Sequence, residues 1–350
     1  MFQQANKSQV AATLPRNCTI EVSDWRILSN FWHPVAFAHD VTDKPLHAKL
    51  LDVELVVYRT SGGIAVARDL CPHRGARLSL GRIASDRLVC PMHGLHFDHT
   101  GKCTRIPSIP DPNATIPDKL CLQSYLSTEH YGIVWTCLSG KPIWPLPIWE
   151  GISNPDFKKL YLPHDTWLTS APRHVENFND IAHFPWVHTH SFGGDEDAAS
   201  PPYKVEHTDY GLTFAVSYDE NFNRFPDGVP GNQRHVTYTY ELTYPFSTII
   251  KVAPTGSGFV HFFGDTVCPV SANETKIFQL CTDTTGKPDR ALWLKDGIII
   301  NSEDKPIVEG QHPEELPLDL RDEVHIPADR MSLEYRRALV KKFGLGAWAR

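Results

Sequence analysis

Two cysteines and two histidines lie in two short segments of the chain, at spacings that suit a single metal site. Cys71 and His73 are separated by one residue, and Cys90 and His93 by two residues. A Cys₂His₂ set is common in structural zinc sites, although cysteine there usually pairs with cysteine and histidine with histidine. Here each segment contributes one of each. This arrangement favours a two-iron cluster with both thiolates on one iron and both imidazoles on the other.

The pattern C-x-H followed by C-x-x-H resembles the Rieske [2Fe-2S] signature. The resemblance implies that Cys71, His73, Cys90 and His93 hold one [2Fe-2S] cluster. High-potential Rieske proteins carry an additional cysteine in each cluster segment, and neither segment has one here. Their absence favours the oxygenase or ferredoxin type over a respiratory subunit.

Two positions beside the cluster residues depart from the usual Rieske pattern. The family usually has an aromatic residue and a tryptophan where this chain has Met92 and Leu95. We expect both side chains to lie where a neighbouring subunit or a reductase touches the cluster.

A second group of metal-ligand residues lies in the run N-x-x-D-x-x-H-x-x-x-x-H, formed by Asn177, Asp180, His183 and His188. Residues three apart share a helix face, so the first three would lie together. His188 is five residues beyond His183, which places it about 140° away on a straight helix. We expect Pro185 to break or kink the helix, so that both histidines reach one ion.

Two histidines need a third protein ligand. A 2-His-1-carboxylate set with open positions is the arrangement of O₂-activating non-haem Fe(II) sites. Asp304 in E-D-K-P-I-V-E-G-Q, just after an apolar helical run, is the best candidate for the carboxylate. Glu303 is the alternative carboxylate, and His190 is the alternative histidine.

The helical run and the later E-D-x-x-x-x-E-x-Q stretch together resemble the catalytic domain of Rieske non-haem iron oxygenases. This resemblance implies that His183, His188 and Asp304 bind one mononuclear Fe(II), with Asn177 near the metal. It also implies that Asp180 is the family's bridging acid. That acid accepts hydrogen bonds from a cluster histidine of one subunit and an iron histidine of its neighbour.

Two domains are needed to position these groups. Short β-rich runs joined by turns fill residues 29–137 and predict an all-β domain. We expect this Rieske domain to span residues 25–145, after an N-terminal tail of residues 1–24. A proline-rich segment at residues 141–147 marks its end.

The pattern changes from residue 146 onward. Residues 203–283 contain long alternating strands, and residues 173–192, 288–300 and 329–343 have helical character. Alternation of this kind suits an antiparallel sheet with one covered face. We therefore predict an α+β catalytic domain over residues 146–350, a sheet covered by helices in a helix-grip-like architecture.

The substrate pocket is expected between the iron-binding helix and the sheet. Its predicted lining residues are Tyr240, His261, Phe263 and Trp293. His261 could hydrogen-bond a carboxylate or a ring carbonyl of the substrate. A histidine on the solvated face of a strand is the alternative interpretation.

Composition limits the class of protein. The chain has 350 residues, 41% hydrophobic and 21% charged, which is ordinary for a globular protein of two domains. Its net charge of −7 disfavours a nucleic-acid partner, and no apolar run is long enough to cross a bilayer. The cysteines outside the cluster pattern lack the spacing of a disulfide framework, which indicates a reducing, cytoplasmic location.

The same resemblance implies a terminal oxygenase, most similar to the vanillate, dicamba and methylxanthine demethylase branch of the family. Such an enzyme uses O₂ and electrons to hydroxylate, or to N- or O-demethylate, a small aromatic or heterocyclic substrate. The sequence has no Gly-rich nucleotide fingerprint, so NAD(P)H must be oxidised by a separate flavin and iron-sulfur reductase, with or without a ferredoxin. The family also implies a homotrimer in which electrons cross between subunits.

Three other interpretations remain at this point. A cis-dihydroxylating dioxygenase of aromatic rings would use the same ligands. A Rieske ferredoxin-type electron carrier would hold the cluster without the mononuclear iron. A zinc-stapled binding protein would hold neither.

Overall fold

The computed structural model describes residues 12–111, 114–189, 191–193, 199–221, 233–285 and 289–346. The chain divides into two compact units, Met1–Pro145 and Leu146–Arg350, and each is described by itself. His190, the alternative iron ligand, lies outside the described residues, as do Pro288 and residues 1–11 of the expected tail.

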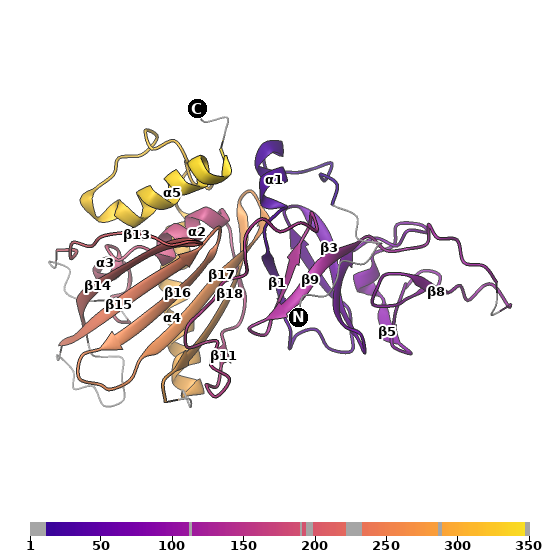
Figure 1. Ribbon diagram of the computed structural model, residues 1–350, viewed down its shortest axis with the longest axis horizontal. Coiled ribbons are helices and arrows are strands. Elements are labelled where there is room, and N and C mark those ends of the chain that lie inside the picture. The colour runs from indigo at the N-terminus through magenta and orange to yellow at the C-terminus, as the bar shows by residue number, and fades with distance from the viewer. Residues whose placement is uncertain are drawn as a thin grey trace. The chain divides into compact units, whose positions relative to one another are not determined.

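The first unit consists almost entirely of short strands (Figure 1). Its elements are α1 (Val22–Leu28), β1 (His33–Phe37), β2 (Leu46–Leu50), β3 (Val53–Thr60), β4 (Gly63–Arg68), η1 (Leu78–Leu80), β5 (Arg82–Ala84), β6 (Arg87–Val89), β7 (His96–Phe97), β8 (Cys103–Arg105), β9 (Ser124–His130) and β10 (Ile133–Cys137). Over the part of the unit that the structure describes, one sheet has the order β1-β10-β9-β4-β3-β2 and the other the order β5-β6-β7-β8. The predicted all-β class is confirmed, whereas α1 and β9 were not predicted.

A left-handed turn separates β2 from β3. Leu51 and Asp52 have φ values of 49° and 62°, and β2 and β3 pair antiparallel on either side. Asp52 Oδ2 accepts hydrogen bonds from the backbone N–H and the hydroxyl of Thr19, at 2.7 and 2.8 Å. Aspartate tolerates the left-handed region better than most residues, which explains the turn here.

A buried apolar cluster supports the two metal-ligand loops of this unit. It includes Val56, Tyr58, Leu88 and Phe97 from the strands, and also the two ligand cysteines. The loops therefore begin at buried positions, and only their tips reach the surface.

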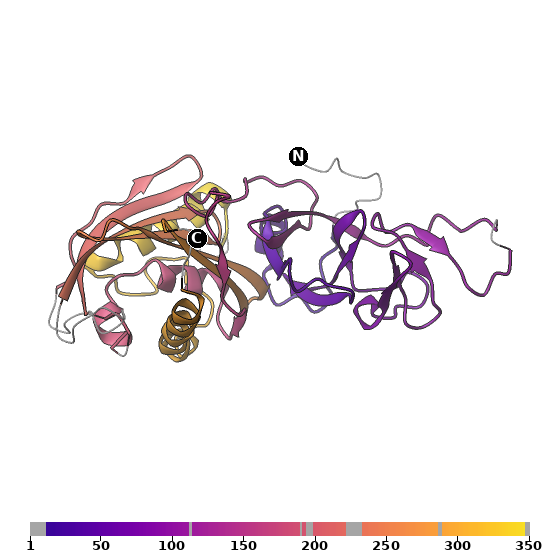
Figure 2. The ribbon, with the colours of Figure 1, turned by 90° about the horizontal axis from the view of Figure 1, so that it is seen from below.

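The second unit is a curved antiparallel sheet with helices (Figures 1 and 2). Its elements are β11 (Leu160–Tyr161), β12 (Asp165–Trp167), α2 (Ala171–Phe178), α3 (Phe184–Val187), β13 (Glu206–His207), β14 (Gly211–Asn221), β15 (Gln233–Thr243), β16 (Ser247–Pro254), β17 (His261–Ser271), β18 (Glu274–Asp283), α4 (Arg290–Glu309), η2 (Pro327–Asp329) and α5 (Arg330–Phe343). The strand order among the described residues is β11-β18-β17-β16-β15-β14-β13, and β12 also pairs with β18.

The helices cover the face of the sheet that buries its apolar side chains. In β15 the alternate residues Val236, Tyr238, Tyr240 and Leu242 are buried. Figure 2 shows α2, α3 and α4 on the same side of the curved sheet, and α5 packs against α2 and β14. The predicted α+β class, a sheet covered by helices in a helix-grip-like arrangement, is confirmed.

The helical region expected at residues 173–192 consists of the two helices α2 and α3, and the expectation that the break lies at Pro185 was wrong. Helix α2 ends at Phe178, because the Asn179 side chain donates a hydrogen bond to the Val175 carbonyl at 2.7 Å. Pro185 instead lies in the first turn of α3, where its missing N–H leaves no hydrogen bond unmade. Asp180 and His183 consequently lie in the connection between two helices and not on one helix face.

Helix α4 is longer than the apolar run at residues 288–300 indicated. It continues to Glu309 and so includes Asp304, with Pro306 inside its last turns. Among the described residues, no helix combines the length and the apolar character that crossing a membrane requires.

Candidate active site and metal centres

The two cluster loops of the first unit have the same backbone design. The Cys71 N–H donates to the Ala76 carbonyl at 2.8 Å, and the Cys90 N–H donates to the Leu95 carbonyl at 2.9 Å. In each loop a glycine, Gly75 or Gly94, donates back to the cysteine carbonyl and has a positive φ, 73° or 66°. A residue with a side chain is strained in that conformation, which explains the two glycines.

These loops place two buried thiols below two exposed imidazoles. Cys71 and Cys90 are 2% and 1% exposed, and the ring centroids of His73 and His93 lie 4.6 Å apart. Burial and the neighbouring Cys90 thiol raise the pKa of Cys71 to about 11, although hydrogen bonds from backbone N–H groups of the loop oppose them. Backbone donors around a cysteine sulfur favour the thiolate that a metal cluster binds, so the loops fit a [2Fe-2S] cluster.

We expected both Met92 and Leu95 to lie where a partner could touch them, but only Met92 is exposed. Met92 is 59% exposed, whereas Leu95 is 3% exposed and belongs to the apolar cluster under the loops. Leu95 cannot touch a partner, because it forms part of the support on which the second loop rests.

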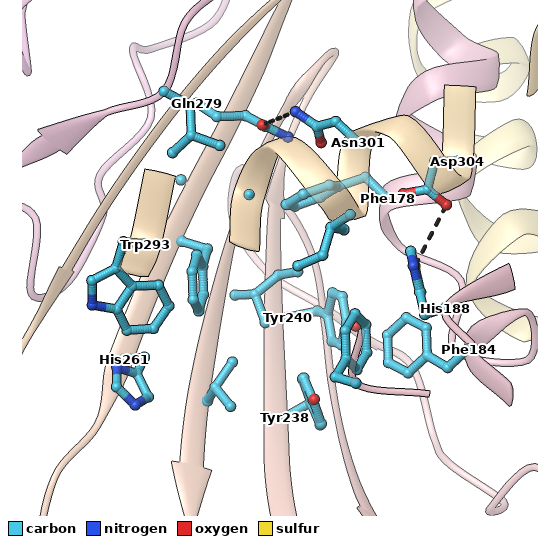
Figure 3. A pocket seen from close by; sticks show the side chains of 18 of the residues that line it. Phe178, Phe184, His188, Tyr238, Tyr240, His261, Gln279, Trp293, Asn301 and Asp304 are labelled. Carbon is cyan, nitrogen blue, oxygen red and sulfur yellow. Dashed lines mark hydrogen bonds and ion pairs between the residues drawn. The ribbon is translucent and has the colours of Figure 1, made fainter. Parts of the chain in front are cut away.

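The second unit brings His183, His188 and Asp304 together. One ligand atom from each lies within 4.8 Å of the others. The two Nε2 atoms are 3.2 Å apart, and Asp304 Oδ1 is 3.4 Å from that of His183 and 3.5 Å from that of His188. Figure 3 shows Asp304 on α4 facing His188 across the end of a cavity.

The far ring nitrogen of each histidine faces a second carboxylate. His183 Nδ1 lies 3.0 Å from Asp180 Oδ2, and His188 Nδ1 lies 3.0 Å from Glu303 Oε2. A carboxylate only accepts, so each Nδ1 carries a proton and each Nε2 lone pair can face a metal. Glu303, the alternative ligand, therefore contacts His188 at the ring nitrogen that faces away from the other two ligand residues.

The three converging groups favour a positive charge between them. Burial opposes charge on His183, but hydrogen bonds and charges of Asp180 and Asp304 outweigh it and raise the pKa of His183 to about 9. Burial also opposes charge on Asp304, yet His183, His188 and the Asn177 side chain hold its pKa below the ordinary value. Asp304 Oδ1, the oxygen that faces both Nε2 atoms, is buried. This donor set fits an Fe(II) ion.

A cavity of about 130 Å³ ends at these three residues and extends between α4 and the sheet (Figure 3). All four pocket residues expected from the sequence, Tyr240, His261, Phe263 and Trp293, line it, as does Asn177. Residues that the sequence reasoning missed include Phe178, Phe184, Tyr238, Gln279 and Asn301. Asn301 could have been found, since it precedes Asp304 by one helical turn.

An ordered polar chain runs from His174 on α2 over strands β17 and β18 to the cavity wall. Gln279 Nε2 donates to Asp265 Oδ2 at 2.9 Å, and Asn301 Nδ2 donates to Gln279 Oε1 at 2.7 Å. Asp265 also lies 3.2 Å from His174 Nε2. Because the carboxylate only accepts, the orientations of both amides are fixed. Asn301 Oδ1 therefore points away from Gln279 and is available as an acceptor (Figure 3).

An all-β unit with mixed cysteine-histidine loops, followed by a helix-grip-like unit with a 2-His-1-carboxylate set, defines the class of Rieske non-haem iron oxygenases. Family comparison agrees. Residues 31–125 match the Rieske [2Fe-2S] domain, and residues 167–343 match the vanillate O-demethylase oxygenase C-terminal domain.

Individual relatives cover most of the chain. Methylxanthine N1-demethylase NdmA of Pseudomonas putida is 30% identical over 89% of this chain and 88% of its own. Its structure with caffeine has a TM-score of 0.80 at 28% identity, covering 91% of both chains. The structure of dicamba monooxygenase, 19% identical with a TM-score of 0.73, shares the fold.

The chain belongs to the Rieske non-haem iron oxygenases, with a catalytic domain of the vanillate O-demethylase type. It is a terminal oxygenase, a non-haem iron monooxygenase with a Rieske [2Fe-2S] cluster and a mononuclear iron. Electrons reach it from NAD(P)H through a separate reductase. The predictions of class, cofactors and reductase dependence are confirmed, and the electron-carrier and zinc-protein alternatives are discarded.

Proposed function

We propose that this oxygenase removes a methyl group from nitrogen or oxygen of a small heterocyclic or aromatic compound bound in the cavity of the second unit. The observation that carries the proposal is the cavity itself, which is lined by aromatic side chains and ends at His183, His188 and Asp304. Relatives that span most of the chain are methylxanthine demethylases acting at N1 and N3, which supports N-demethylation.

The proposed ligand sets are those expected from the sequence. Cys71, His73, Cys90 and His93 would hold the cluster, and the mononuclear iron would be held by the three residues at the cavity end, His183, His188 and Asp304. Iron bound there supplies O₂ activation with electrons from the reductase. Hydroxylation of a methyl carbon attached to nitrogen or oxygen gives a hemiaminal or hemiacetal, which releases formaldehyde.

The cavity residues would bind and orient the substrate. Phe263 and Trp293 lie edge to face with ring centroids 5.0 Å apart, and Phe178 and Phe184 lie nearer the proposed iron ligands. Such a lining suits a flat ring and excludes water from the reacting carbon. Asn301 Oδ1 would accept a hydrogen bond from a ring N–H. His261 lies at the end of the cavity opposite His188 and Asp304 (Figure 3).

Electron delivery would depend on a homotrimer, in which the cluster of one subunit serves the iron of the next. Asp180 would link the two centres. Its side chain is 27% exposed while it contacts His183 Nδ1, so it can be reached from outside the subunit. We also propose a cytoplasmic location, in keeping with eight cysteines of which none forms a disulfide.

Product analysis tests the proposed reaction. Purified protein, a surrogate reductase and NADH would be incubated with a panel of N-methyl heterocycles and methoxyarenes. We expect formaldehyde and the demethylated ring in equal amounts. A cis-diol product would instead identify a dihydroxylating dioxygenase.

A matched variant tests the ligand set. His188→Ala should lose the mononuclear iron and all product while retaining the Rieske visible spectrum. A His188→Ala protein with full iron content and activity would contradict the assignment.

A further inference from the structure

A buried carboxylate lies directly behind the proposed iron site without joining it. Glu303 Oε2 accepts hydrogen bonds from His188 Nδ1 at 3.0 Å and from the Ser191 hydroxyl at 2.6 Å. The side chains of Glu303 and His188 are only 8% and 2% exposed. Water therefore competes weakly for this contact, which makes the orientation of the ring dependent on the carboxylate.

The backbone around His188 supports the same orientation. The N–H groups of Ser191 and Gly193 donate to the His188 carbonyl at 3.2 and 2.8 Å. A Cβ atom at Gly193 would lie 2.6 Å from that carbonyl oxygen and 2.5 Å from the carbonyl oxygen of Phe184. The turn that places Ser191 beside Glu303 is therefore tight and leaves no room for a larger residue.

We propose that Glu303 is a positioning residue for the iron site, which holds His188 in the tautomer that binds metal. Glu303 keeps the proton on Nδ1, so that the Nε2 lone pair points toward His183 and Asp304. This inference rests on the ligand set proposed above, because it concerns the orientation of one of those ligands.

A neutral amide at this position would not enforce the tautomer. In Glu303→Gln the amide oxygen can accept from Nδ1–H, but the amide can also flip and donate to Nδ1. The Ser191 hydroxyl can rotate to suit either arrangement, since it both donates and accepts. The flipped amide leaves the proton on Nε2, where it blocks coordination, so metal affinity falls.

Asp180 differs, although it also contacts a histidine of the set. Its carboxylate accepts backbone hydrogen bonds from Ala182 at 3.0 Å and from His183 at 3.2 Å, in addition to the His183 ring. An amide there would point its N–H₂ group at the Ala182 backbone N–H in one orientation and at the His183 backbone N–H in the other, so a substitution at Asp180 would not isolate the effect on the tautomer. Glu303 is therefore the acid at which a neutral amide tests the tautomer most directly.

Cobalt binding tests the proposal without turnover. Protein that retains its Rieske cluster but has been stripped of mononuclear iron would be titrated anaerobically with Co(II), in competition with a chelator. We expect the Kd of Glu303→Gln to be about 10- to 100-fold higher than wild type, with altered Co(II) absorption bands and an unchanged Rieske spectrum. Ser191→Ala should give a smaller increase, because the carboxylate remains but loses the Ser191 hydroxyl as a donor.

Asp165→Asn is the matched control for a purely structural effect. Asp165 anchors α4 through Lys305 Nζ, at 3.0 and 3.1 Å, and among the described residues it makes no hydrogen bond with His183 or His188. We expect this variant to bind Co(II) as wild type does. An equal loss in Asp165→Asn and Glu303→Gln would overturn the proposal.

The remaining outcomes separate the two proposals. If His188→Ala keeps wild-type Co(II) affinity, the ligand assignment fails. If His188→Ala loses Co(II) but Glu303→Gln binds as wild type does, only the positioning role fails. If Glu303→Gln does not fold, Ser191→Ala decides, and unchanged affinity in that variant overturns the proposal.

Discussion

At the scale of single residues, the two acids behind the histidines have different surroundings. The Asp180 side chain is 27% exposed, and that of Glu303 is 8% exposed. Exposure leaves Asp180 accessible to a partner, whereas Glu303 can act only within its own subunit. We therefore assign electron delivery to Asp180 and metal-ligand orientation to Glu303.

Asp180→Asn should retain both metal centres and lose most turnover. The amide oxygen can still accept from His183 Nδ1, but the negative charge between the proposed centres is gone. We expect turnover to fall roughly 10- to 100-fold. Iron content and the Rieske spectrum, measured beside product formation, check this.

Full turnover of Asp180→Asn at full iron occupancy would contradict the bridging role. A loss of iron equal to the loss of turnover would instead show that Asp180 acts on the ligand alone.

At the scale of elements, a buried ion-pair network joins the helix that precedes the site to the last helix. Arg336 on α5 is 2% exposed and contacts Glu176 on α2 through two hydrogen bonds, at 2.7 and 2.6 Å. It also lies 2.6 Å from Glu323, which in turn pairs with Arg173 on α2 at 2.9 Å. The network fixes α2, from which Asn177 reaches Asp304.

Arg336→Leu should destabilise the second unit by about 3 kcal/mol, because it leaves two largely buried carboxylates with one cation. Urea unfolding followed by far-UV circular dichroism measures the effect, and the Rieske absorbance reports the first unit separately.

Arg337→Leu is the control. Arg337 is 43% exposed and pairs only at the surface with Glu334, so its loss should cost less than about 0.5 kcal/mol. Equal effects of the two substitutions would contradict a stabilising role of the buried Arg336 network.

At the scale of the whole molecule, the proposed electron transfer between subunits can be tested by mixing. Co-expressed His73→Ala and His183→Ala chains with different tags would be purified as mixed trimers. Each cyclic mixed trimer contains one interface from an intact cluster to an intact iron site. We expect about one third of wild-type activity per trimer.

The two homotrimers, purified apart and then combined, are the control and should be inactive. Inactive mixed trimers that hold both metal centres would show that electrons stay within one subunit.

The sequence by itself determined the features that depend on the spacing of residues close together in the chain, namely the cluster loops and the covered face of the sheet. Cys71 and His73 lie in one loop, and that spacing with Gly75 already specifies the ligand type and the loop conformation. Strand alternation such as Tyr238 and Tyr240 likewise predicted the covered sheet. Both signals act within a few residues, where backbone geometry alone fixes which side chains lie together.

Only the tertiary structure decided which distant groups meet. Glu303 and His188 are 115 residues apart, and their contact depends on how α4 lies against the sheet. The pairing of Gln279 with Asn301 has the same origin. The sequence also misplaced the helix break, since the Asn179 side chain and not Pro185 ends α2. Such contacts follow from packing between elements, for which the spacing of residues along the chain carries no signal.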